Sequence, residues 1–374
     1  NRGDLPITTD KSVMTIKITA IDNKYKLDRI NVFINDVPIF DMDGINLRTL
    51  NSNNIKKDIN LELSQGENKI QVSCLNDKGA ESYKESVYVK YQPKEPVTGK
   101  NYLVAISVSD YQESKYNLKY AVKDGKDMAK MFADKGFVVD TFFNSSVARD
   151  SILSLKQKLM QTKVDDQVII YISGHGLLDK NYDFYFATYD MNFENPAEHG
   201  ILYDDLEGLL DGIPARKKLL FMDACHSGEV DKEDICTSDS LLANNQVKGD
   251  LKVYKYKGTI IEGEVSSGLG LQNSFELMQE LFANLSRGSG AVVISAASGV
   301  GYALESAEWN NGVFTYCILN GLKNLVADLN NDKIITVCEL KEYISKEVEK
   351  LTNGKQKPTS RQENLSNDFE IWRN

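Results

Sequence analysis

The chain has 374 residues, of which 41% are hydrophobic and 26% are charged, and its formal net charge is −10 at pH 7. This composition is typical of a soluble globular protein that is long enough for two domains. The negative charge argues against nucleic-acid binding through phosphate contacts, and no apolar run is long enough to span a membrane.

Cysteine usage and the start of the chain bear on its compartment. The five cysteines are an odd number and include no C-x-x-C pair, so neither a disulfide framework nor a structural zinc site is expected. No signal peptide opens the chain, and its first residue is Asn1 rather than Met, which indicates a trimmed N-terminus. We therefore expect a reducing compartment, the cytoplasm.

The first quarter of the chain alternates between apolar and polar residues. Within 12–91 five segments show this period of two, and in 30–34 and 59–63 every second residue is Ile, Val or Leu. Short alternating strands separated by turn signals predict a small all-β, immunoglobulin-like sandwich over residues 1–95. The next segment, 92–100, contains two of the seven prolines and no periodicity, and we interpret it as a linker.

From residue 101 onward, apolar strands alternate with amphipathic helices. The expected strands are 102–108, 137–143, 167–173, 217–224 and 290–297. The expected helices are 118–134, 147–161, 203–211, 273–285, 312–326 and 338–352. This alternation predicts an α/β domain over residues 100–374, with a mostly parallel sheet and helices on both of its faces.

Two short strings end two of these strands. Ser-Gly-His-Gly follows the strand at 167–173, and Asp-Ala-Cys-His-Ser-Gly follows the strand at 217–224. Parallel strands bring their carboxyl ends to one edge of a sheet, so His175 and Cys225 can meet there. Such a pair is sufficient for thiol nucleophilic catalysis, because the imidazole can take the thiol proton and later protonate the leaving amine.

The general base can be argued by elimination among three histidines. His226 adjoins Cys225, and neighbouring side chains of a strand point apart, whereas His199 lies in a polar loop. His175 remains, and the backbone amides of Gly176 and Cys225 are candidate donors to an oxyanion. The alternative is a buried core cysteine and a turn histidine, but two glycine-flanked positions at strand ends favour catalysis.

Together the two strings resemble those of the caspase-like cysteine peptidases, specifically metacaspases, paracaspases and their bacterial relatives. The similarity extends over about residues 101–374 and includes Asp-Gly-Lys-Asp-Met at 124–128 and Asn-Gly-Val-Phe-Thr at 311–315. The resemblance implies a caspase-like fold and a cysteine endopeptidase that requires no cofactor. It also implies that His175 and Cys225 form the dyad and that Gly176 contributes to the oxyanion hole.

The same resemblance implies a substrate specificity. In metacaspase-like enzymes the acid two residues before the cysteine lines the S1 pocket and pairs with a P1 Arg or Lys, and here that acid is Asp223. Asp124 matches a second pocket acid and Ser173 a pocket hydroxyl, although Asp124 can also be read as an exposed helix carboxylate. Side chains two residues apart share a strand face, so Asp223 is expected beside Cys225. The expected partner is a peptide or protein with a basic P1 residue.

Two further segments stand out. Residues 230–272 lack a helical stripe and are rich in Gly, Ser, Asp and Lys; a loop this long is usually functional, and the resemblance implies an activation segment that the enzyme cuts itself. Residues 328–339 place oxygen donors at positions 1, 3, 5, 9 and 12 of an EF-hand-type loop. Lys333 replaces the usual glycine and no second hand is present, so calcium and a plain polar loop both stay open.

Two other functions stay open. One is a non-catalytic caspase-fold scaffold whose β-sandwich binds a partner, which the presence of His175, Cys225 and Asp223 together disfavours. The other is a transpeptidase or ligase that uses the same dyad for acyl transfer, which product analysis with an amine acceptor would reveal.

Overall fold

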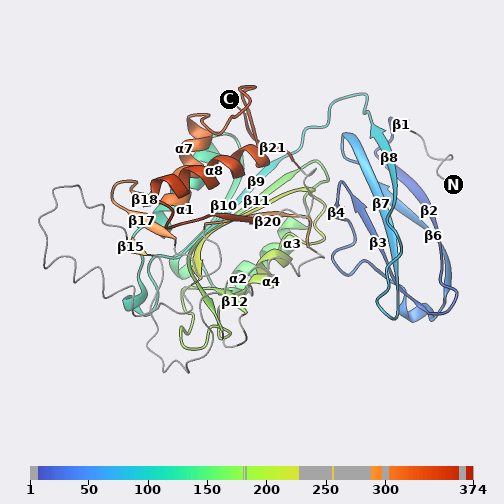
Figure 1. Cartoon of the computed structure of the whole chain (residues 1–374), viewed down its shortest axis with the longest axis horizontal. Coiled ribbons are helices and arrows are strands. Elements are labelled where there is room, and N and C mark those ends of the chain that lie inside the picture. Colours follow the sequence, from blue (N-terminus) through green and yellow to red (C-terminus); the bar gives the residue numbers. More distant parts are fainter. Residues whose placement is uncertain are drawn as a thin grey trace, which may run out of the picture.

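The structure, a computed structural model, comprises an all-β N-terminal part and a larger α/β part (Figure 1). The residues that it describes are 7–179, 181, 183–226, 255–256, 288–296, 303–361 and 368–373. Within these ranges, no helix combines the length and the apolar character that crossing a membrane would require.

The N-terminal part consists of two facing sheets. One has the order β1-β8-β7-β3-β4 with β5 paired to β3, and the other is the antiparallel pair of β2 and β6. The bounds are Thr8–Thr9 (β1), Val13–Ile21 (β2), Leu27–Ile34 (β3), Val37–Pro38 (β4), Ile45–Asn46 (β5), Asn54–Glu62 (β6), Gly66–Asn76 (β7) and Glu85–Tyr91 (β8), with a 3-10 helix at Arg48–Leu50. Alternate side chains of both sheets, such as Ile30 and Leu61, are fully buried in one shared core. The predicted β character of this part is confirmed.

The α/β part is built on a sheet with the strand order β10-β9-β11-β14-β16-β20. The first five strands run parallel and β20 runs antiparallel to β16. Their bounds are Val138–Phe143 (β10), Asn101–Ser107 (β9), Gln167–Leu178 (β11), Lys217–His226 (β14), Val292–Ser295 (β16) and Thr359–Arg361 (β20). β12 (Phe184–Phe186) pairs with the end of β11 and with β13 (Ile201–Leu202). The mostly parallel sheet is therefore confirmed.

Helices cover both faces of this sheet, as predicted (Figure 1). Their bounds are Ala121–Asp134 (α1), Arg149–Leu153 (α2), Leu155–Leu159 (α3), Tyr203–Gly208 (α4), Val313–Lys323 (α7) and Val337–Leu351 (α8). Side chains of α1, α7 and α8 form one core cluster with Ile169 and Tyr171 of β11, whereas those of α2, α3 and α4 pack with Ile170 and Ile172. Successive residues of a strand point to opposite faces, which explains this division.

Smaller elements complete the described residues. These are 3-10 helices at Ser114–Tyr116 and Asn144–Ser146 and the strands β15 (Lys255–Tyr256), β17 (Leu304–Ser306), β18 (Asn311–Gly312), β19 (Ile334–Thr336) and β21 (Glu370–Arg373).

Two details differ from the sequence-based expectation, and two predicted segments are not tested. The helix expected at 147–161 is two short helices, α2 and α3, that meet at Ser154. Strands β11 and β14 continue beyond their expected ends, because the two stay paired as far as Gly176 and His226. The expected helix at 273–285 lies outside the described residues, as does the loop at 230–272 apart from β15.

The N-terminal part contacts the amino ends of the central strands. Arg216, which directly precedes β14, is 7% exposed and donates hydrogen bonds to the Ser64 hydroxyl at 2.8 Å and to the Glu62 carbonyl. Burial lowers its pKa to about 10, so the guanidinium is still charged at neutral pH. Next to it, the Gln65 amide donates to the Asp165 carboxylate, 3.0 Å away, just before β11. A buried cation thus joins the two parts of the chain.

Replacing Arg216 by Met should lower the free energy of unfolding by about 2 kcal/mol or more, since hydrogen bonds to a charged group are lost in a buried contact. Urea denaturation measures this change. Lys158→Met is the matched control, because Lys158 is in an exposed ion pair with Asp140, whose loss should cost less than about 1 kcal/mol. Equal effects of the two substitutions would contradict a special role of the Arg216 contact.

Candidate functional site

His175 and Cys225 occupy matched positions on neighbouring parallel strands. In the register of β11 and β14, Ser173 is opposite Asp223, His175 is opposite Cys225, and Gly176 is opposite His226. Strands paired in this way lie about 4.8 Å apart. The backbones of the two predicted catalytic residues are therefore adjacent, whereas the side chains of Cys225 and His226 lie outside what the structure describes.

The imidazole of His175 is buried and its Nε2 is hydrogen-bonded to the backbone. Its Nε2 lies 2.8 Å from the carbonyl oxygen of Tyr116, and the residue is 2% exposed. A carbonyl oxygen can only accept, so Nε2 bears the proton and Nδ1 of the neutral ring is the basic nitrogen. This tautomer suits a general base that acts through Nδ1.

Aromatic side chains frame this imidazole. The ring of Tyr111 lies 5.1 Å from that of His175, and Phe193 approaches edge-on at 5.6 Å while stacking on Tyr116. The backbone N–H of His175 donates to the Tyr111 hydroxyl at 2.9 Å. A Cβ atom at Gly174 would lie only 2.9 Å from that hydroxyl oxygen, so the close approach requires glycine there.

Gly176 continues the extended backbone after His175. It is paired with Phe186 of the antiparallel strand β12 and with His226 of β14. The carbonyl of His175 accepts a hydrogen bond from the Ala187 amide at 2.9 Å, which secures this end of β11. The assignment of Gly176 to an oxyanion hole stays a prediction.

A row of buried polar residues crosses the sheet two residues before His175 and Cys225 on their strands. Ser107 of β9, Ser173 of β11 and Asp223 of β14 are register partners, and all three are fully buried. Residues two apart on a strand point to the same face. The structure therefore brings Ser173 and Asp223, two predicted pocket residues, together beside the dyad positions.

Asp223 is bound by the first turn of α7. The Thr315 hydroxyl donates to its Oδ2 at 2.6 Å, and the same hydroxyl oxygen lies 2.6 Å from the Tyr171 hydroxyl. Burial, and after it the charges of Asp223 and Asp124, raise the pKa of Tyr171 well above its usual value. Tyr171 therefore keeps its proton and can act as a hydrogen-bond donor.

Asp124 lies on α1 and is fully buried, so the reading of it as an exposed helix carboxylate is wrong. Its Oδ1 accepts from the Asn311 side-chain amide at 2.8 Å, and its two oxygens lie 3.1 and 3.2 Å from the backbone N–H of Gly312. Gly312 is the N-cap residue of α7. Asp124 therefore connects α1 to the amino end of α7, the same end whose Thr315 binds Asp223.

Sequence reasoning missed the side chains that support the predicted residues. The string at 311–315 supports the family resemblance, which assigns no role to its residues. In the structure its first residue, Asn311, binds Asp124 and its last, Thr315, binds Asp223. Tyr171 gave one usable signal, because it stands two residues before Ser173 on the same strand face. Tyr111, Tyr116 and Phe193 belong to no recognisable motif.

In the EF-hand-like loop at 328–339, side-chain oxygens accept hydrogen bonds from groups of the same loop. The two carboxylate oxygens of Asp328 accept from the amides of Asp332 and Lys333 at 3.2 and 2.9 Å, and Glu339 forms a capping box with Thr336. Lys333 adopts a left-handed φ of 68°, as a glycine would at that turn. No group of three His, Cys, Asp or Glu side chains suited to a metal occurs among the described residues. Calcium binding stays an untested prediction.

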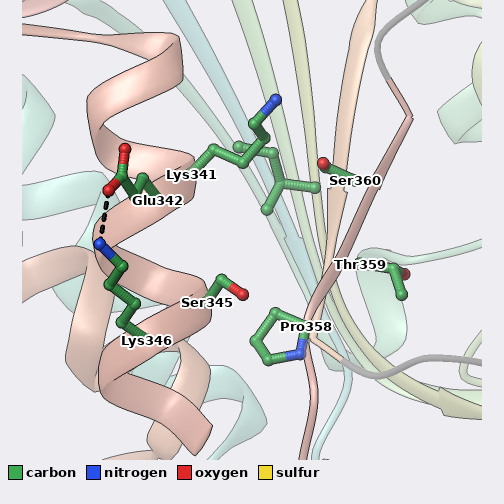
Figure 2. A pocket seen from close by; sticks show the side chains of 8 residues that line it. Lys341, Glu342, Ser345, Lys346, Pro358, Thr359 and Ser360 are labelled. Atoms are coloured by element: carbon green, nitrogen blue, oxygen red, sulfur yellow. Dashed lines mark hydrogen bonds and ion pairs between the residues drawn. The ribbon is translucent and has the colours of Figure 1, made fainter.

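A pocket of about 370 Å³ lies away from these residues, between α8 and strand β20 (Figure 2). Lys341, Ser345 and Pro358 are among its lining residues, and Lys346 forms an ion pair with Glu342 at its rim. It contains none of the predicted site residues.

Comparison with known proteins identifies a family. The model of the caspase domain family matches residues 100–370, and a search of curated proteins returns no match. A protein of Geobacter sulfurreducens with a known crystal structure is 17% identical, with a TM-score of 0.46; the match covers 70% of this chain and 92% of that one.

Proposed function

Because the chain belongs to the caspase family, as the match over residues 100–370 shows, we propose that it is a metacaspase-like cysteine endopeptidase that cleaves after basic residues. Cys225 is the nucleophile and His175 is the general base. The main support is the register that sets His175 opposite Cys225 on two parallel strands.

In the proposed reaction, Nδ1 of His175 takes the proton of the Cys225 thiol, and the thiolate sulfur attacks the carbonyl carbon of the scissile peptide. The backbone amides of Gly176 and Cys225 stabilise the resulting oxyanion. The imidazolium then protonates the leaving amine, and water hydrolyses the acyl-enzyme. The hydrogen bond from Nε2 to the Tyr116 carbonyl supports this route, because it orients the ring and stabilises its protonated form.

The proposed S1 pocket uses Asp223 as the partner of a P1 guanidinium or ammonium. Its burial places a negative charge where solvent screens it little, so a basic P1 side chain is attracted and a P1 Asp is repelled. Ser173 is proposed as a second polar group of the pocket. Asp124 is proposed to add negative charge near the pocket. After burial, its charge is one of the causes, with that of Asp223, that raise the pKa of Tyr171.

The N-terminal part and the cellular setting complete the proposal. The two-sheet N-terminal part fits an immunoglobulin-like domain that binds a partner not yet identified. The resemblance to bacterial relatives and the cysteine usage support a bacterial, cytoplasmic enzyme.

Replacing Cys225 or His175 by Ala should lower peptidase turnover by roughly a thousandfold or more, because the dyad acts as a unit. Hydrolysis of a fluorogenic peptide with P1 Arg measures this. Cys338→Ala is the control, since Cys338 is a half-buried residue of α8, and it should keep wild-type turnover. Full activity of Cys225→Ala would refute the assignment, and an inactive wild type would favour the non-catalytic scaffold.

Asp223→Ala should lower kcat/KM on P1 Arg peptides by at least about tenfold, because loss of one partner of a buried charge pair typically costs about 2–5 kcal/mol. A positional-scanning peptide library measures the preference at P1, and Asp134→Ala is the control, with an exposed carboxylate at the end of α1. A wild-type preference for P1 Asp is the result that would overturn the proposed pocket.

Self-cleavage within 230–272 is also proposed, because this segment contains lysines that an enzyme specific for basic P1 residues can cut. Intact-mass spectrometry of the purified wild type should then show fragments that end after a lysine, and Cys225→Ala should stay whole. Fragments of equal abundance in both proteins would show that another protease makes them.

A further inference from the structure

Three buried hydroxyl and carboxyl groups from different elements form a hydrogen-bonded chain. Tyr171 comes from β11, Thr315 from α7 and Asp223 from β14, and all three are fully buried. The Thr315 oxygen lies 2.6 Å from both the Tyr171 hydroxyl and Oδ2 of Asp223. The contact between Thr315 and Asp223 has the length of a hydrogen bond from a hydroxyl to a charged acceptor.

The direction of this chain follows from counting protons. An ionised carboxylate only accepts, and a threonine hydroxyl has one proton to donate. Thr315 therefore donates to Asp223, and its oxygen accepts from Tyr171. Because one hydroxyl makes both bonds, the carboxylate of Asp223 is tied through Thr315 to the position of Tyr171.

The position of Thr315 in its helix strengthens the arrangement. Thr315 lies in the first turn of α7, an 11-residue helix whose N-cap is Gly312. The amino end of a helix bears a partial positive charge, which favours carboxylates nearby. The amide of Gly312 binds Asp124 and the hydroxyl of Thr315 binds Asp223, so one helix end holds both acids.

We propose that Thr315, supported by Tyr171, is a positioning residue for P1 specificity, which orients the Asp223 carboxylate toward a basic P1 side chain. This inference rests on the proposed role of Asp223 in the S1 pocket. It adds that recognition of the substrate depends on α7, a helix that contributes no group to the proposed bond-breaking steps.

Thr315→Val is the informative change, because valine has nearly the same shape and lacks the hydroxyl. It should lower kcat/KM on P1 Arg peptides by about 10–100-fold, mostly through KM, since the hydrogen bond to a charged group is lost. Alkylation of the Cys225 thiol by iodoacetamide needs no S1 contact, so its rate should stay within about threefold. Thr315→Ser should restore peptide cleavage.

Two further variants complete the test. Thr352→Val is the matched control, because Thr352 is a buried threonine whose hydroxyl donates to a backbone carbonyl of α8; both rates should stay at wild-type values. Tyr171→Phe removes the outer donor, together with the contact of this hydroxyl with Ser173, and should give a smaller loss confined to P1 Arg cleavage. It also serves as the test if Thr315→Val fails to fold.

The outcomes separate this inference from the proposed function. If Asp223→Ala loses P1 Arg cleavage while Thr315→Val and Tyr171→Phe do not, the positioning role is wrong and the pocket stands. Equal losses of cleavage and alkylation in Thr315→Val would show a merely structural role. If Asp223→Ala cleaves P1 Arg peptides as well as the wild type, the proposed pocket itself fails.

Discussion

The parallel pairing of β11 with β14 is the constraint on which the candidate site depends. Their register extends from Gln167 opposite Lys217 to Gly176 opposite His226. It fixes two rows at the carboxyl ends, one with Asp223 and one with Cys225. A slip by one residue would turn every side chain of one strand to the other face and bury polar groups in the wrong core cluster. The apolar residues that precede both rows therefore secure the site as well as the fold.

The two ends of these strands have separate tasks. Arg216 and Asp165 contact the N-terminal part where β14 and β11 begin, whereas the candidate site lies at the opposite ends. From Arg216 to Cys225 an extended strand covers roughly 30 Å at its usual rise per residue.

Much of this arrangement could be predicted from the sequence, because apolar runs mark strands and two strings mark their ends. What could not be predicted are contacts between side chains with no local pattern. The Tyr116 carbonyl and His175 are 59 residues apart, and Thr315 and Tyr171 are 144 apart. The burial of Asp124 was also hidden, since a carboxylate on an amphipathic helix usually faces water, and its hydrogen bonds to Asn311 and Gly312 join segments far apart in the sequence.

The two tasks of the proposed site draw on two different core clusters. Tyr111 and Phe193, which frame His175, belong to the core cluster that packs with α2, α3 and α4. Tyr171 belongs to the cluster of α1, α7 and α8, on the face where Thr315 binds Asp223. Interiors packed this densely leave side chains few alternative positions. Each cluster therefore helps to fix one part of the proposed site, the imidazole of His175 in one case and the carboxylate of Asp223 in the other.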